Sequence, residues 1–221
     1  MASSTVENYL KQLSLQQREG HAGKVQMGRL AAAMGVVPGT ATSMVKALSD
    51  SGLVVYEPRE GVRLTASGEQ LALHVLRRHR LIELFLVKVL DLDWSEVHAE
   101  ADDLEHAISD RVLERLDALL GHPTVDPHGD PIPSPKGQLH ESARISLADC
   151  PVGVAQRICR VLDQEPQFLQ FVERQGLMPG ATVTVERRET AAEAVRIRVP
   201  RRDGVSLGLV AAAKILVESR T

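Results

Sequence analysis

The sequence has little cysteine and no long apolar run. Its two cysteines among 221 residues, Cys150 and Cys159, cannot form a disulfide framework and do not have the Cys-x-x-Cys spacing of a thiolate metal site. We therefore expect a reducing compartment, the cytoplasm. No apolar run has the length of a bilayer-spanning helix, and the first residues, MASSTVENYLKQL, lack the apolar core of a signal peptide. We expect no membrane partner.

Charge is distributed unevenly along the chain. Residues 1–73 carry 7 basic and 6 acidic side chains, residues 74–140 carry 7 and 13, and residues 141–221 carry 12 and 10. The net charges of the three segments are thus +1, −6 and +2, and seven of the eight histidines lie in the acidic middle segment. Histidine and carboxylate together are ligands for a divalent metal ion, although a solvated acidic surface would have the same composition.

A boundary is predicted at residues 121–137, which hold five of the eleven prolines and three glycines. A helix cannot cross such a segment. The residues before it have mostly helical periodicity, and those after it have mostly strand patterns. We therefore predict a mainly α fold with some β structure, in three domains at residues 1–73, 74–140 and 141–221.

The first segment has the pattern of a winged helix-turn-helix. An apolar helix pattern over residues 25–35 is followed by a second helix that begins at Pro38. Two short β-branched runs, Leu53–Glu57 and Val62–Thr65, then flank a Pro-Arg-Glu-Gly turn, which predicts a hairpin. In such a motif the second helix enters the major groove of DNA, and the hairpin is the wing.

The predicted recognition helix has small polar side chains on its non-core face. Such side chains reach base edges and phosphates while the backbone comes close. The candidate DNA-binding residues of this helix are Pro38, Gly39, Thr40, Thr42, Ser43 and Lys46. Arg59, at the tip of the wing, is a candidate for a phosphate or minor-groove contact. The net charge of +1 is low for a DNA-binding domain, and plain structural packing of the helices is the alternative.

Two longer helices are predicted in the middle segment, over residues 67–90 and 95–120, with N-caps at Ser67 and Ser95. Their broad apolar faces predict dimerisation. Helical spacing also brings histidines and carboxylates to one face of each helix. The candidate metal ligands are His79 and Glu83 on the first helix, and His98, Asp102, Glu105 and His106 on the second.

The ligand types restrict the metal and the function. The cluster contains no sulfur, and oxygen and imidazole ligands favour Mn²⁺ or Fe²⁺ over a closed structural zinc site. A winged helix joined to such a cluster predicts a metal-dependent transcriptional regulator, not an enzyme. Two alternatives remain: a metallohydrolase, although the chain has no nucleophile motif or phosphate loop, and a DNA-binding protein with a purely structural metal.

Essentially the whole chain resembles the diphtheria toxin repressor family, the iron- and manganese-dependent repressors of bacteria. The resemblance rests on RRHRLIELFLVKVLDLDWSEVHAEADDLEHAISDRVLERLD, on the preceding helix-turn-helix and wing, and on PHGDPIP. It implies a homodimer that binds promoter DNA and controls metal-homeostasis genes.

The resemblance also implies two metal sites per subunit. One is formed by His79, Glu83 and His98 with a residue of the C-terminal domain, and the other by Asp102, Glu105 and His106 with a ligand from the first helix. Iron-selective members tend to have cysteine, and manganese-selective members a carboxylate, at the position of Asp102. The comparison therefore implies Mn²⁺ ahead of Fe²⁺.

This sequence departs from the family pattern in two places. The first-helix ligand position is Asn8, a weak ligand, and Lys11 follows one turn later, where its charge would repel a cation. The second site is therefore expected to be weak, altered or empty. In the linker, a metal-binding Cys-Pro-His-Gly of some relatives is replaced here by Asp126-Pro127-His128-Gly129. Asp126 and His128 are candidate ligands beside Glu83, and a simple proline-rich turn is the alternative.

The C-terminal segment is predicted to be a small β-barrel with one helix. Strands are predicted over Val152–Leu162, Thr182–Arg188, Ala194–Val199 and Val205–Val217, with a helix over Pro166–Gln175. The segment resembles the SH3-like domain of the family, in which polar residues complete a metal site. The candidates are Asp163, Glu165 and Gln167, with Asp163 preferred, and solvated surface is the alternative for each.

The predicted mechanism is metal-gated DNA affinity. The metal-free dimer would sample arrangements in which the two recognition helices do not match successive half-sites of a pseudo-palindrome. Metal binding would select the DNA-competent arrangement, and by linkage DNA would tighten metal binding by the same factor.

Overall fold

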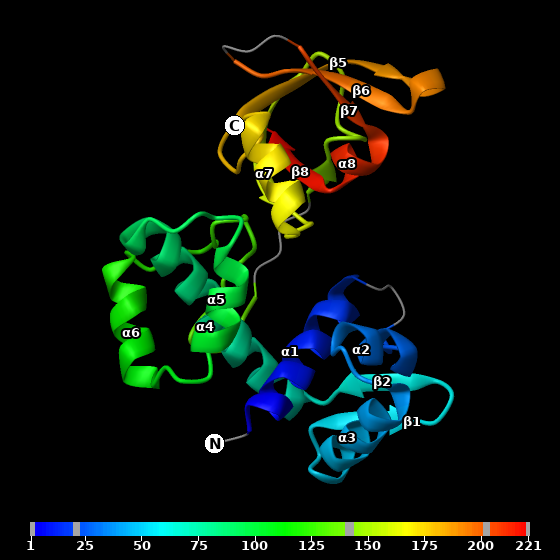
Figure 1. Cartoon of the computed structure of the whole chain (residues 1–221), viewed down its shortest axis with the longest axis vertical. Coiled ribbons are helices and arrows are strands. Elements are labelled where there is room, and N and C mark those ends of the chain that lie inside the picture. The colour runs from blue at the N-terminus through cyan, green and yellow to red at the C-terminus, as the bar shows by residue number, and fades with distance from the viewer. Residues whose placement is uncertain (1–2, 20–22, 140–143, 201–203, 220–221) are drawn as a thin grey trace. The chain divides into compact units, whose positions relative to one another are not determined.

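The computed structural model describes residues 3–19, 23–139, 144–200 and 204–219 (Figure 1). Its contacts divide the chain into two compact units. The first unit comprises Met1–His79, Glu105–Ile108 and Pro133–Leu139, and the second comprises Arg80–Leu104, Ser109–Ile132 and His140–Thr221. No helix within the described residues is long and apolar enough to cross a membrane.

The first unit contains the predicted winged helix-turn-helix. Its elements are α1 (Ser4–Glu19), α2 (Met27–Ala33), α3 (Pro38–Asp50), β1 (Val54–Glu57) and β2 (Gly61–Leu64) (Figure 1). On α3, Ala41, Val45 and Leu48 recur every three or four residues and are buried, as their spacing predicts. They pack with residues of α1, including Leu10 and Leu13, in one apolar core. β1 and β2 form an antiparallel hairpin.

Helix α4 (Ala66–Leu90) follows β2 directly and runs from the first unit into the second. Its predicted N-cap at Ser67 is wrong. The Thr65 hydroxyl accepts a 3.1 Å hydrogen bond from the backbone N–H of Gly68, so Thr65 is the cap. The helix begins one residue before the predicted start because Thr65, at the end of the hairpin, already has the side chain that an N-cap requires.

The single helix predicted over residues 95–120 is also wrong. The chain forms α5 (Val97–Leu104) and α6 (Asp110–Leu119), and Ser109 caps α6 by accepting from the N–H of Val112. Glu105 and His106 lie in the turn between the helices, so they do not share a continuous helix face with His98 and Asp102. A serine followed by an aspartate is a strong helix start, and the turn buries the Glu105 side chain completely.

Ser95 is not a helix cap either. Asp93 accepts hydrogen bonds from the backbone N–H of Ser95 at 2.8 Å and from its hydroxyl at 2.7 Å, and α5 begins only at Val97. These two bonds also lower the pKa of the Asp93 carboxyl. The aspartate rather than the serine therefore organises the entry into α5.

The C-terminal part of the second unit is a six-stranded antiparallel sheet in the order β3-β8-β4-β5-β6-β7. The elements are β3 (Ile145–Ser146), β4 (Ala155–Val161), α7 (Pro166–Arg174), β5 (Thr182–Glu189), the 3₁₀ turn η1 (Thr190–Ala192), β6 (Ala194–Arg198), β7 (Val205–Gly208), α8 (Leu209–Ala213) and β8 (Ile215–Ser219). Its buried valine, leucine and isoleucine side chains form one core that includes Cys150 and Trp94.

Two of the predicted strands differ from the structure. The stretch Val205–Val217 is not one strand, because the alanine-rich segment Leu209–Ala213 forms α8 between β7 and β8. The strand predicted from Val152 begins only at Ala155, after the left-handed Gly153. The mainly α fold class with an N-terminal winged helix-turn-helix and a small C-terminal sheet domain is confirmed, whereas the exact three-domain boundaries remain a prediction.

The Asp126–Asp130 loop is fastened to β4 and α4. The backbone N–H of Val161 donates to the carbonyl of His128 at 2.9 Å, and Asp130 accepts from Arg80 at 3.1 Å and from Gln164 at 2.9 Å. Gly129 has φ +86°, and a Cβ there would lie 1.9 Å from the carbonyl oxygen of Cys159. Only glycine permits this approach, so the loop position is fixed by backbone contact.

We predict that Gly129→Ala destabilises the protein far more than Gly121→Ala. Gly121 also has positive φ, +76°, but nothing lies within 4 Å of its Cβ position. Gly121→Ala should therefore cost only the left-handed strain, about 1–2 kcal/mol, whereas Gly129→Ala should cost roughly 3 kcal/mol or more through overpacking as well. Urea denaturation measures both. Equal losses would show that the loop is not packed against β4.

Candidate metal centre and nucleic-acid interface

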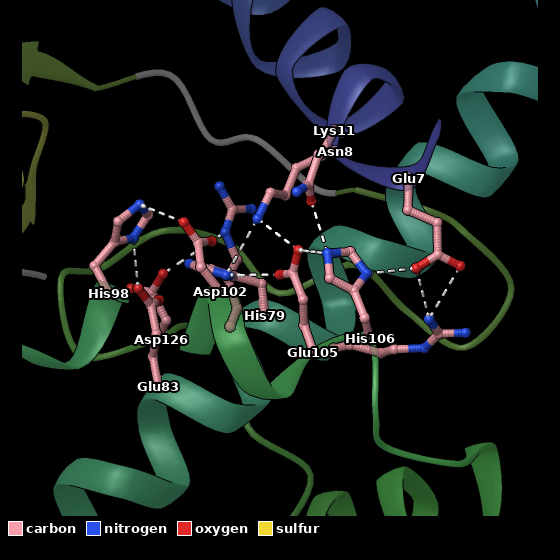
Figure 2. Close-up of polar contacts among 12 residues, drawn as sticks. Glu7, Asn8, Lys11, His79, Glu83, His98, Asp102, Glu105, His106 and Asp126 are labelled. Atoms are coloured by element: carbon pink, nitrogen blue, oxygen red, sulfur yellow. Dashed lines mark hydrogen bonds and ion pairs between the residues drawn. The ribbon is translucent and has the colours of Figure 1, made fainter. Parts of the chain in front are cut away.

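Glu83 is the centre of a group of potential metal ligands in the second unit. The side chain lies on α4 and is 1% exposed. Its Oε1 is 3.0 Å from Nδ1 of His98, and its Oε2 is 4.0 Å from Nδ1 of His128. Glu83, Asp126 and His128 each offer a ligand atom within 4.8 Å of the others. Figure 2 shows Glu83 between His98 and Asp126. The sequence-predicted residues of α4, α5 and the proline-rich loop are thus brought together.

His128 is oriented by Trp94. Its Nε2 lies 2.8 Å from the carbonyl oxygen of Trp94, and its ring stacks on the indole with 5.4 Å between centroids. A carbonyl can only accept, which places the N–H on Nε2 and leaves a lone pair on Nδ1. That Nδ1 is buried and has no hydrogen-bond partner among the described residues. A metal-binding histidine typically has this arrangement, with its second nitrogen donating to a fixed acceptor.

Asp126 has one satisfied oxygen and one unsatisfied oxygen. Oδ1 accepts from the backbone N–H groups of His128 and Asp130 at 2.8 and 2.9 Å. Oδ2 is buried without a hydrogen-bond partner, since Nε of Arg80 is 3.6 Å away, too far for a hydrogen bond. Burial raises the pKa of the Asp126 carboxyl well above its usual range, the Asp130 and Glu83 carboxylates raise it further, and Arg80 opposes them.

These observations show that the residues fit a divalent cation. Within the described residues, Asp126 Oδ2 and His128 Nδ1 are buried without hydrogen-bond partners, and both lie beside the buried Glu83 carboxylate. An unsatisfied buried polar group costs about 1–3 kcal/mol. A cation bound to both atoms would remove this cost. Its oxygen and nitrogen atoms are ligands that Mn²⁺ and Fe²⁺ accept.

The exposed side of this group faces a groove beside the sheet domain. His98 is 47% exposed, and its Nε2 lies 4.0 Å from Asp102, one turn later on α5. Asp163 and Glu165 line the same groove with His98 and Lys214, whereas Gln167 is not among its lining residues. Asp163 accepts from Lys214 at 2.6 Å and from the N–H of Glu165 at 3.0 Å. Partial burial raises the pKa of Asp163, but these two bonds outweigh it and the pKa is lowered.

A second group of predicted residues lies in the first unit, around the buried Glu105. Its Oε1 accepts from Lys11 Nζ at 2.7 Å, and its Oε2 is 2.8 Å from His79 Nδ1. The ring of His106 lies between Glu7 and Asn8 (Figure 2), with Nδ1 2.7 Å from Glu7 and Nε2 2.8 Å from Asn8. His79 precedes Glu83 by one turn of α4.

Sequence reasoning missed several residues of these two groups. It did not name Glu7, although Glu7 and Lys11 are four residues apart and therefore share a helix face. It also missed Arg78, which lies 3.4 Å from Glu7, and Arg80, which holds the proline-rich loop. Trp94 had no signal in the sequence, because its contribution is a backbone carbonyl and a stacked ring.

The predicted recognition helix α3 presents its candidate residues to solvent. Pro38, Gly39, Thr40, Ser43 and Lys46 are exposed, and Thr42 is half-buried. The hydroxyls of Thr42 and Ser43 donate to the carbonyls of Pro38 and Gly39, at 2.8 and 3.1 Å. These hydroxyl oxygens therefore keep lone pairs as acceptors, while the Lys46 ammonium is a donor on the same helix.

The wing carries an exposed arginine in a strained conformation. The N–H of Glu60 donates to the carbonyl of Glu57, which closes a turn with Pro58 second and Arg59 third. Arg59 has φ +72°, a value that this position of a type II turn normally assigns to glycine. Lys24 pairs with both Glu57 and Glu60 at 2.6 Å, which raises the Lys24 pKa and lowers the Glu57 pKa. The acidic neighbours of Arg59 are thus engaged elsewhere.

Comparison with known proteins gives one consistent result. Models of the iron-dependent repressor match in two parts, the N-terminal DNA-binding domain at residues 1–62 and the metal-binding and dimerisation domain at residues 65–134. A FeoA domain model matches residues 145–219. The iron-dependent repressor IdeR of Mycobacterium tuberculosis is 32% identical over 191 residues, which cover 81% of this chain and 82% of the relative.

Other relatives are named for manganese. The regulator MntR of Lysinibacillus sphaericus is 29% identical over 120 residues, 54% of this chain and 84% of the relative. A solved manganese-dependent transcriptional repressor in complex with manganese is 38% identical, with a TM-score of 0.88 over 97% of this chain and 100% of that one. The relatives give the metallohydrolase alternative no support. The chain belongs to the iron-dependent repressor family, that of the diphtheria toxin repressor, and is a metal-dependent DNA-binding transcriptional repressor rather than an enzyme.

Proposed function

We propose that this repressor responds to Mn²⁺ in preference to Fe²⁺, and that it binds promoter DNA as a homodimer to control metal-homeostasis genes. The observation that carries the proposal is a pair of buried ligand atoms beside Glu83, Asp126 Oδ2 and His128 Nδ1. In the part of the chain that the structure describes, neither atom has a hydrogen-bond partner. A repressor of promoters acts where the chromosome is, so we place it in the cytoplasm.

The proposed ligands are Glu83, His98, Asp126 and His128. Glu83 and His98 are already 3.0 Å apart, and the loop residues converge on the other carboxylate oxygen. His79, one helical turn before Glu83, is a further ligand in this proposal. Asp163 or Glu165 completes the set from the groove beside His98, and Asp163 must first release Lys214 to do so.

The preference for manganese rests on ligand chemistry and on the relatives. The proposed ligands contain no sulfur, which disfavours Zn²⁺ selectivity and leaves Mn²⁺ and Fe²⁺. Asp102, next to His98, is a carboxylate, as the resemblance implies for manganese-selective members. The structurally similar repressor with manganese bound supports the same choice for this chain.

The proposed gating acts through α4. Glu83 and Asp126 would hold the divalent cation, which would place a double positive charge beside both buried carboxylates. These residues then hold α4, α5 and the loop in one arrangement. Helix α4 follows the wing directly and also carries Glu83. A movement of Glu83 along or about the axis of α4 is therefore transmitted to the winged helix through the backbone of the same helix. DNA and metal must therefore tighten each other's binding by the same factor.

Helix α6 offers an apolar face for the homodimer. Val112, Leu116 and Leu119 are spaced at four and three residues, and Val112 and Leu119 are 48% and 65% exposed. Large exposed apolar side chains in register favour an interface. A two-fold dimer would present two recognition helices to successive half-sites of a pseudo-palindrome, which supplies the contacts that a net charge of +1 per domain does not.

We predict that DNA binding depends on the metal and on Glu83. In gel-shift titrations on manganese-transport promoter DNA, Mn²⁺ or Fe²⁺ should produce a complex that EDTA removes. Glu83→Gln should abolish the response, and Glu100→Gln, an exposed neighbour on α5, should preserve it. Equal binding in EDTA and Mn²⁺ would refute gating and leave any metal a structural role.

We predict opposite effects of Asp126→Asn on the two states. The amide keeps the shape and removes a buried carboxyl whose ionised form is destabilised by burial, so the metal-free protein should be at least as stable as the wild type. Mn²⁺ affinity should fall on the order of 100-fold, because a charged ligand is lost. Calorimetric titration and thermal melts in EDTA measure the two effects. A variant with undiminished Mn²⁺ affinity would remove Asp126 from the site.

We predict that Arg59 is retained in the wing for DNA contact at the expense of stability. Arg59→Gly should stabilise the protein by about 1 kcal/mol, because glycine accepts positive φ without strain. The same variant should bind DNA more weakly, with a salt dependence reduced by about one phosphate contact. Arg59→Lys keeps both the charge and the strain, and it should retain binding. Unchanged DNA affinity in Arg59→Gly would exclude the wing contact.

A further inference from the structure

Lys11 is a buried lysine held by a buried carboxylate. Its side chain is 6% exposed, and that of Glu105 is fully buried. The ammonium lies 2.7 Å from Oε1 of Glu105 and 3.5 Å from Nδ1 of His79. Nδ1 of His79 donates to the other Glu105 oxygen, so the carboxylate is the acceptor of the ammonium. The ammonium therefore occupies a position against a buried carboxylate that a divalent cation would need.

The other potential ligands of this group are also engaged. Oε2 of Glu105 lies 2.8 Å from His79. Nδ1 of His106 faces Glu7 at 2.7 Å, and Nε2 faces Asn8 at 2.8 Å and Glu105 at 3.3 Å (Figure 2). Both ring nitrogens of His106 therefore face oxygen atoms of the protein. A cation bound by Glu105 would also have to lie against the Lys11 ammonium, a like charge.

The two buried carboxylates of this group, Glu7 and Glu105, are each paired with a cation of the chain. Glu105 is paired with Lys11, and Glu7 is paired with Arg78 at 3.4 Å. Around Glu83 the arrangement is different. Arg80 lies against both Asp126 and Asp130, and Asp126 Oδ2 has no hydrogen-bond partner among the described residues. That group thus keeps an open buried ligand atom, whereas Glu105 is held by Lys11. The second metal site implied by the family resemblance does not fit the residues present here.

We propose that this repressor takes one metal ion per subunit, and that the Lys11 ammonium is a tethered cation in place of the second ion. The proposal rests on the proposed function, in which the single ion binds at Glu83. Lys11 is on α1 of the winged helix, and Glu105–Ile108 belongs to the same compact unit. The link between α1 and this turn therefore forms without metal, and the metal response contains only the Glu83 step.

Two consequences distinguish this arrangement from a two-ion site. Each subunit has a single class of metal site, so Mn²⁺ binding should fit one ion per chain with no second, weaker phase. The contact between Lys11 and Glu105 does not need a metal, so α1 should stay packed against the Glu105 turn in EDTA. Chelation should thus release DNA without unfolding the winged helix, which amide hydrogen exchange of α1 can follow.

The test counts Mn²⁺ on the full-length protein by elemental analysis after equilibrium dialysis at saturating Mn²⁺. We expect one ion per wild-type chain, lost in Glu83→Gln. Lys11→Glu replaces the ammonium with a carboxylate and should raise the count from one to two. Circular dichroism establishes that each variant is folded, and anomalous scattering from Mn²⁺ in crystals locates the ions.

The outcomes separate the two proposals. Two ions per wild-type chain, or one ion located at Glu105, would overturn the tethered-cation inference and leave metal-dependent repression intact. No ion in the wild-type protein would overturn the proposed function itself. A folded Lys11→Glu protein that still binds one ion would show that the ammonium is not what occupies the second position. If Lys11→Glu does not fold, the wild-type count and the anomalous map still decide.

Discussion

The burial of carboxylates is the constraint on which this structure depends. Glu7, Glu83, Glu105, Asp126 and Asp130 are each less than a tenth exposed. A buried charge is tolerated only with a counter-charge or hydrogen bonds, because desolvation is expensive. Arg78, Lys11 and Arg80 supply counter-charges to Glu7, Glu105 and Asp130. Asp126 lies 3.6 Å from Arg80 but keeps one buried oxygen without a hydrogen-bond partner among the described residues, and the proposed metal site is built around that oxygen.

The position of the proline-rich loop determines where this oxygen and the Nδ1 atom of His128 lie. The loop is held by a backbone hydrogen bond to β4 and by Arg80 and Gln164, which donate to the Asp130 carboxylate. Asp126 and His128 therefore cannot turn away to find other partners. A flexible loop would relieve its unsatisfied atoms by exposure to water. Because the loop holds these atoms in position, a cation that binds them costs little conformational entropy. The rigidity of the loop is therefore part of the affinity of the site.

The sequence predicted what depends on local periodicity and missed what depends on distant partners. The apolar spacing of α3 and the turn chemistry of the wing were sufficient to predict the winged helix. The break at Glu105 was missed because the helical periodicity continues across the Ser109–Asp110 helix start, and because the lysine that holds Glu105 in the turn is on α1, 94 residues away. Asp126 and His128 were candidates only by resemblance, since nothing local shows that their free atoms point at Glu83. The predicted N-caps at Ser67 and Ser95 were displaced by two residues, because a neighbouring side chain, Thr65 or Asp93, accepts the hydrogen bond instead.

Trp94 connects three parts of the molecule in a way that has a practical meaning. It is the chain's single tryptophan. Its indole packs in the core of the sheet domain and stacks on His128, and its carbonyl fixes the tautomer of that ring. Any rearrangement of the imidazole changes the environment of the only indole, and no second tryptophan contributes to the signal. The fold thus contains an intrinsic fluorophore beside the loop that carries two of the proposed metal ligands.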